Sequence, residues 1–191
     1  MYKRQPYDTK ALEPHLSRET VQQRHGQAQL ACVARLNRLV AGTPWAGHSL
    51  EAIALGAGGE LSRQAALAWA LTFHGHALSP RAGAPGDALA AAIETRWGGL
   101  DGLRDAFAAA AADGPAGGWV WLVRDGHGLA LVTTEAGDLP LRRGLTPLLV
   151  HPLAPAADDG DDGEARLAAF WALANWHFAT TNFSGPAAPA A

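Results

Sequence analysis

A long stretch of helical spacing near the N-terminus constrains the fold more than any other feature of this chain. Apolar side chains recur at helical intervals from Val21 onward. The stretch begins at Ser17, a residue type that caps helix N-termini, and it stops at Gly42 and Pro44. The sequence therefore predicts one long helix over residues 17–42.

The rest of the chain changes from helical to strand-like patterns and then returns to helix. A Pro/Gly-rich linker is expected at Ser79–Asp87, and a DGHG turn is expected to join the first two strands. The other predicted elements are helices at Ser62–Leu78, Ala88–Trp97, Leu100–Ala112 and Glu164–Thr180, and strands at Trp119–Arg124, Leu129–Thr134 and Pro147–Leu153. Strands that follow helices without alternating with them indicate an α+β fold.

The linker divides this pattern into two domains and a tail. We expect an N-terminal helical hairpin domain over residues 1–82 and a C-terminal α+β domain over residues 83–182. The remaining residues, 183–191, are rich in small residues and proline and are expected to be disordered.

Composition and charge exclude several classes of function. The 191 residues carry a formal net charge of -3 with scattered basic residues, so no nucleic-acid partner is expected. The single cysteine, Cys32, excludes an intrachain disulfide and the multi-cysteine zinc patterns. No signal peptide or membrane span is visible, which makes a cytoplasmic location the expectation.

Five stretches of the chain together resemble one known family, the iron/manganese superoxide dismutases. The resemblance implies a helical hairpin packed on a C-terminal lobe with a three-stranded antiparallel sheet. It also implies a single Fe or Mn ion between the lobes and superoxide dismutase as the family activity. The stretches are YDTKALEPHLSRET, LNRLVAGT, ALAWALTFHGHALSP, GGWVWLVRDGHGLALVTT and FWALANWHF.

The resemblance also implies where the family's metal ligands, three histidines and an aspartate, should stand. Arg24 occupies the position of the first ligand, and Ala28 and Cys32 occupy those of a histidine and a tyrosine beside it. Leu71 occupies the second ligand position. His151 or Pro152 falls nearest the aspartate position, and Pro155 or Ala156 falls nearest the last histidine. Neither an alkyl group nor a protonated guanidinium can bind a cation.

These substitutions predict a pseudoenzyme without the metal, without a cofactor and without catalytic residues. We expect it to serve as a structural or protein-interaction module that forms a dimer with itself or pairs with a related dismutase-fold chain. The alternative is an enzyme of the family with a substitute metal site, or a site for a small molecule in the vacated cavity. The cavity is expected to be lined by Arg24, Ala28, Cys32, Leu71, His74, Trp119, Trp121 and His151.

Five histidines are candidates for a substitute site: His25, His74, His76, His151 and His177. His74 lies one helical turn after Leu71 and should face the cavity, where His151 could meet it. His76, two residues further on, should point away from His74. Arg24 is expected to extend to solvent, and Cys32 to be a small buried apolar residue. The acidic run Asp158–Glu164 is expected to be a solvated loop.

Overall fold

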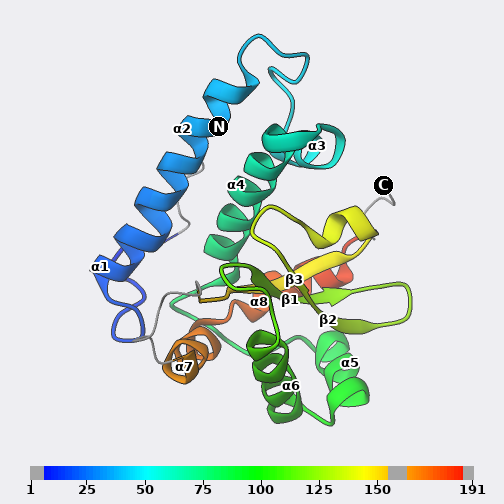
Figure 1. Cartoon of the computed structure of the whole chain (residues 1–191). Coiled ribbons are helices and arrows are strands. Elements are labelled where there is room, and N and C mark those ends of the chain that lie inside the picture. The colour runs from blue at the N-terminus through cyan, green and yellow to red at the C-terminus, as the bar shows by residue number, and fades with distance from the viewer. Residues whose placement is uncertain (1–6, 155–162, 187–191) are drawn as a thin grey trace.

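The computed structural model describes residues 7–154 and 163–186, without the side chains of residues 23–25. Two long helical segments, residues 18–40 and 59–77, run antiparallel on one side of a small sheet and are called the helical arms (Figure 1). Shorter helices cover the sheet. The elements are α1 Arg18–Thr20, η1 Val21–Gln27, α2 Ala28–Val40, α3 Leu50–Gly56, α4 Gly59–Ala77, α5 Asp87–Trp97, α6 Leu100–Ala112, β1 Trp119–Arg124, β2 Leu129–Thr134, η2 Pro140–Arg143, β3 Thr146–Pro152, α7 Gly163–Leu173 and α8 Trp176–Ser184.

The first helical arm begins where the sequence predicts but is not a uniform α-helix. The Ser17 hydroxyl accepts a hydrogen bond from the Thr20 backbone N–H at 3.1 Å, which is an N-cap. Residues Val21–Gln27 then form a π-helix, so the prediction of one regular helix is wrong in this segment. The wider π turn changes which residues share a face. Val21 is the only strongly apolar residue in VQQRHGQ, so the sequence gives no periodic signal there.

The sequence pattern missed α3, a helix of 7 residues. Its N-cap is Ser49, whose hydroxyl accepts from the Ala52 N–H at 3.1 Å. The buried Ser62 hydroxyl on α4 donates to the Ala54 carbonyl on α3 at 2.8 Å and fixes the two helices against each other. Helices α3 and α4 therefore pack against each other in the N-terminal half of the molecule.

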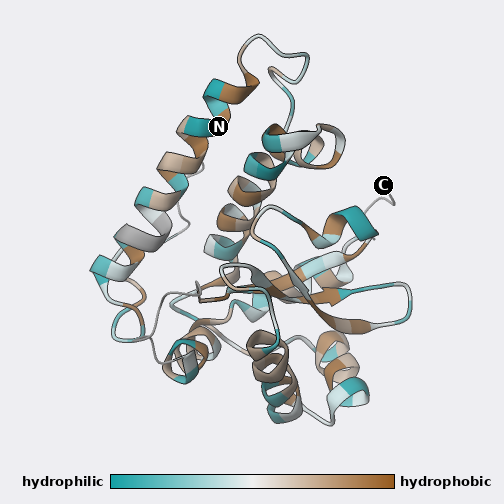
Figure 2. Cartoon of the chain, viewed as in Figure 1, coloured by the Kyte–Doolittle hydropathy of each residue, from teal (hydrophilic) through white to brown (hydrophobic). Residues whose placement is uncertain are grey.

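The sheet is antiparallel with the strand order β2-β1-β3, which confirms the predicted α+β class and its three strands. The Asp125 carboxylate accepts from the His127 and Gly128 N–H groups at 2.7 and 2.8 Å and closes the predicted turn between β1 and β2. Helices α5 and α6 pack on β1 and β2, while α4 and α8 pack on β3. The strands are mostly hydrophobic (Figure 2) and form the centre of the core.

The predicted closing helix is two helices, because Asn175 interrupts it. The Asn175 carboxamide accepts from the Phe178 N–H at 3.1 Å and caps α8, while its amide donates to the His76 carbonyl at 2.9 Å. Helix α8 continues to Ser184, so the first residues of the predicted disordered tail are helical. The end of that tail and most of the predicted acidic loop lie outside the described residues.

None of the helices in the described part combines the length and the apolar composition that crossing a membrane requires.

Candidate functional site

Two buried histidines, His74 on α4 and His151 on β3, face each other between the helical arms and the sheet. Their side chains are 5% and 8% exposed, and their ring centroids are 6.4 Å apart with planes at 78°. The His74 Nδ1 atom lies 3.1 Å from the Val150 carbonyl oxygen. A carbonyl can only accept, so this bond places a proton on Nδ1. The structure therefore brings these two candidate histidines next to each other, and their role as a site stays a prediction.

Aromatic rings surround the pair. The Trp119 ring lies 6.2 Å from His74 and 6.2 Å from Trp121, centroid to centroid. Phe170 on α7 lies 5.0 Å from His151. Trp119 and Trp121 are both buried in the core as predicted, with Trp119 beside His74 and Trp121 beside Trp119. The sequence pattern did not indicate Phe170, whose contact depends on how α7 packs.

The residues predicted on the first helical arm do not share one environment. Ala28 is exposed, whereas Cys32 is only 6% exposed, and its thiol lies 3.6 Å from the Gln64 carbonyl oxygen. Both residues lie in the regular helix α2, four positions apart on one face, so the difference in exposure is one of position along the helix: Cys32 packs against Gln64 of α4, whereas Ala28 stands at the start of α2. Leu71 is half-buried on α4. The predicted orientation of Arg24 concerns a side chain outside those described.

Burial raises the pKa of the Cys32 thiol, and the neighbouring Arg35 guanidinium opposes that rise only in part. The residue is therefore a neutral thiol near pH 7 rather than a thiolate nucleophile. This confirms the prediction of a small buried apolar residue.

Two of the other candidate histidines have surroundings of their own. His76 stacks on Phe178 of α8 with ring centroids 5.8 Å apart. His177 is exposed at the start of α8. The side chain of His25 is outside those described.

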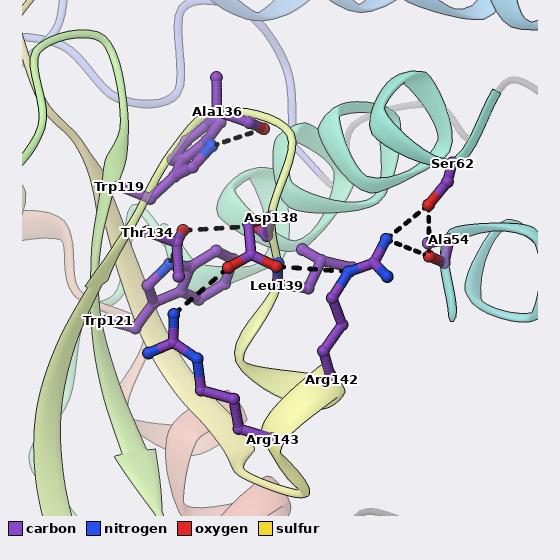
Figure 3. A network of polar contacts seen from close by, with 10 residues as sticks. All are labelled: Ala54, Ser62, Trp119, Trp121, Thr134, Ala136, Asp138, Leu139, Arg142 and Arg143. Carbon is purple, nitrogen blue, oxygen red and sulfur yellow. Dashed lines mark hydrogen bonds and ion pairs between the residues drawn. The ribbon is translucent and has the colours of Figure 1, made fainter. Parts of the chain in front are cut away.

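A network of hydrogen bonds and ion pairs, drawn in Figure 3, holds the side chains of Trp119 and Trp121 in place. The Trp121 indole N–H donates to the Thr134 hydroxyl at 3.0 Å, and that hydroxyl donates to the Asp138 carbonyl at 3.3 Å. Both Trp121 and Thr134 are buried. An indole N–H without such an acceptor would cost about 1 to 3 kcal/mol.

The same network continues across to the helical arms through Arg142 on η2. Its guanidinium pairs with the Asp138 carboxylate at 3.3 Å and donates to the Ser62 hydroxyl and the Ala54 carbonyl at 2.5 Å (Figure 3). Arg142 thus connects the sheet side of the molecule with α3 and α4. Sequence reasoning missed this residue because its partners lie 80 and 88 positions away.

The absence of the family's metal ligands stays a prediction from the resemblance. It places Arg24 at the first ligand position, Leu71 at the second, His151 or Pro152 nearest the aspartate, and Pro155 or Ala156 nearest the last histidine. Among the side chains that the structure describes, no three His, Cys, Asp or Glu residues lie close enough to hold a metal ion. His74 and His151 bring two such donors together, and His74 is not one of the positions at which the resemblance places a family ligand.

Comparisons with known proteins agree with the fold. The model of the alpha-hairpin domain of iron/manganese superoxide dismutases matches residues 2–79, and the model of their C-terminal domain matches residues 85–182. The chain therefore belongs to the iron/manganese superoxide dismutase family.

Among its relatives are three bacterial proteins, each named Superoxide dismutase (Fe). The protein from Pseudoalteromonas translucida is 38% identical over 185 residues, which cover 94% of this chain and 96% of the relative. The Coxiella burnetii protein is 36% identical over 183 residues, covering 93% and 95%. The Escherichia coli K12 protein is 37% identical over 184 residues, covering 94% and 95%.

These relatives overturn the prediction of a metal-free pseudoenzyme. A chain that matches proteins named Superoxide dismutase (Fe) over nearly its whole length points to an enzyme rather than to a module without activity. The prediction rested on the loss of one ligand set. Such a loss excludes coordination by those positions, but it does not exclude coordination by others.

Proposed function

We propose that this protein is an enzyme of the superoxide dismutase family that acts on superoxide at a substitute metal centre containing His74 and His151. The observation that carries the proposal is the 36 to 38% identity to proteins named Superoxide dismutase (Fe) over more than nine-tenths of the chain. The reaction is taken from the name of these relatives.

The geometry of the histidine pair supports the choice of site. Both rings are buried between α4 and β3, where the resemblance places the family's ion between the lobes. Imidazole nitrogens suit iron, and a ligand histidine commonly donates its other N–H to a backbone carbonyl. His74 makes that bond to Val150. His74 and His151 would be the described residues that hold the metal, and the metal would supply the one-electron chemistry.

The aromatic wall supports the same location. Trp119, Trp121 and Phe170 exclude bulk water around the pair, and the Trp121–Thr134 hydrogen bond fixes one side of that wall. A low-dielectric surrounding strengthens the interactions of any charge held there. A small diatomic anion needs little room to reach such a site.

The experiment is a direct measurement of superoxide decay by stopped flow, with protein purified without a histidine tag. The wild type should accelerate the decay in proportion to protein concentration, and His151→Gln should lose that acceleration. His177→Gln, which replaces an exposed histidine on α8, is the matched control and should keep the wild-type rate. A wild-type rate equal to that of buffer would contradict the proposal.

Three further expectations remain proposals. We propose the boundary between the domains near residues 82 and 83, in the linker between the two matched family models. We also propose that the chain self-associates and that the cytoplasm is its location. Sedimentation velocity tests the proposed self-association: a monomer throughout the micromolar range would contradict it.

A further inference from the structure

A cavity lies in the N-terminal half of the molecule, and neither His74 nor His151 lines it. It has a volume of about 590 Å³ and is bounded by α2, the following loop, α3 and α4. Its lining includes no described member of the residues predicted for the vacated metal pocket. Cavities of about 300 to 1,000 Å³ hold small organic ligands. The lining residues that carry the argument are Trp45, His48, Glu51, Trp69, Phe73 and His76.

The walls of this cavity combine aromatic faces with one formal charge. Trp69 and Phe73 on α4 are stacked with ring centroids 5.0 Å apart, and Trp45 lies on the loop before α3. Glu51 is the one lining residue with a formal charge at neutral pH when histidine is counted as neutral. Within the described part of the chain, Glu51 has no ion-pair partner. Its negative charge is therefore available to a ligand.

The loop that carries Trp45 is ordered by its own hydrogen bonds. The Thr43 hydroxyl donates to the Val40 carbonyl at 2.8 Å, and the Trp45 N–H donates to the Thr43 hydroxyl at 3.3 Å. The indole ring lies against Gly56: a Cβ atom there would be 2.5 Å from Cη2 of Trp45. An aromatic wall fixed before binding loses little conformational entropy when a ligand arrives.

We infer that this cavity binds a small organic cation, an ammonium or quaternary ammonium group carried on an apolar body. Aromatic faces attract cations through the negative potential of the ring, and a nearby carboxylate adds a direct charge interaction. The same features disfavour anions, including superoxide. The inference is therefore independent of the proposed reaction, and either can fail without the other.

The test uses benzyltrimethylammonium as the probe and phenylacetate as an anion with a similar aromatic body. Isothermal titration calorimetry at constant ionic strength should show one site for the cation and about tenfold weaker binding of the anion. Glu51→Gln should weaken cation binding about fivefold, and Trp45→Leu about threefold. Glu94→Gln removes the same charge from α5, outside the cavity lining, and should leave the affinity unchanged.

Thermal melts of all variants separate loss of binding from loss of fold. Equal binding of cation and anion, an unchanged affinity in Glu51→Gln, or no heat of binding at millimolar probe would overturn the inference. The superoxide rate of Glu51→Gln should equal that of the wild type, whichever way the binding test falls.

Discussion

Replacing Arg142 by methionine should cost far more stability than the same change at its neighbour Arg143. The Arg142 guanidinium makes two hydrogen bonds to α3 and α4 and an ion pair with Asp138, and its side chain is 33% exposed. Arg143 makes one ion pair with the same carboxylate at 3.3 Å, and its side chain is 53% exposed. Methionine keeps most of the apolar stem at both positions.

The magnitude follows from what the Arg142→Met variant leaves behind. The Ala54 carbonyl still accepts from the Ser62 hydroxyl, so only one acceptor, the buried Ser62 oxygen, loses its partner outright. A hydrogen bond from a charged donor contributes about 1.5 to 3 kcal/mol, and a partly exposed ion pair contributes about 0 to 1 kcal/mol. The free energy of unfolding should fall by about 2 to 3 kcal/mol in Arg142→Met and by at most about 0.5 kcal/mol in Arg143→Met.

Guanidinium denaturation followed by circular dichroism and tryptophan fluorescence measures both values. For a chain of this length, each kcal/mol corresponds to a shift of about 2 to 4 °C in Tm. Arg142→Lys should fall between the wild type and Arg142→Met, because an ammonium lacks the planar fork that reaches both acceptors. Equal stabilities of Arg142→Met and Arg143→Met would refute the claim that Arg142 connects the two halves of the molecule.

Three other predictions concern close packing and burial. Gly118→Ala should destabilise by about 2 kcal/mol or more, since a Cβ there would lie 2.2 Å from the Thr134 carbonyl oxygen; Gly126→Ala, with open space, is the control. Equal denaturation midpoints for these two variants would contradict it. Tyr7→Phe should keep or raise stability by about 1 kcal/mol, because the buried Tyr7 hydroxyl has no hydrogen-bond partner among the described residues; a clear loss in thermal melts would count against this. Burial raises the pKa of the Cys32 thiol in the folded state. The neutral thiol therefore contributes its full stabilisation below the unfolded thiol pKa of about 8.5, and this contribution is lost as the pH rises through the folded pKa. Cys32→Ala should flatten the alkaline part of the stability profile, and an unchanged profile would exclude this cause.

Much of the fold was predictable because the relevant signals are local. Strands β1 and β2 lie at the residues that their aromatic and β-branched composition and the DGHG turn indicate, since strand propensity and turn chemistry act within a few residues. The π-helical segment and α3 were not predictable in this way. One has almost no apolar side chains, and the other is shorter than the window in which helical periodicity is visible. The break at Asn175 depends on a partner on α4, 99 residues away.

The candidate site likewise contains features that the sequence indicates and features that only tertiary packing determines. The proximity of His74 and His151 was suggested by the family resemblance, which places Leu71 at the cavity and His74 one helical turn after it. The exposure of Ala28 and the Arg142 bridge both depend on tertiary packing, which no local pattern shows. The prediction of a pseudoenzyme was wrong because it gave the loss of the known ligand set more weight than the alternative of a substitute metal site.

The metal content of tag-free protein tests the central claim most directly. Inductively coupled plasma mass spectrometry on protein from cells supplied with iron and manganese should find about one Fe or Mn per chain. The double variant His74→Gln/His151→Gln should lose that metal while keeping its fold by circular dichroism, and His177→Gln should retain it. Wild-type protein that is folded but contains neither metal, or a double variant that binds as much metal as the wild type, would contradict the account.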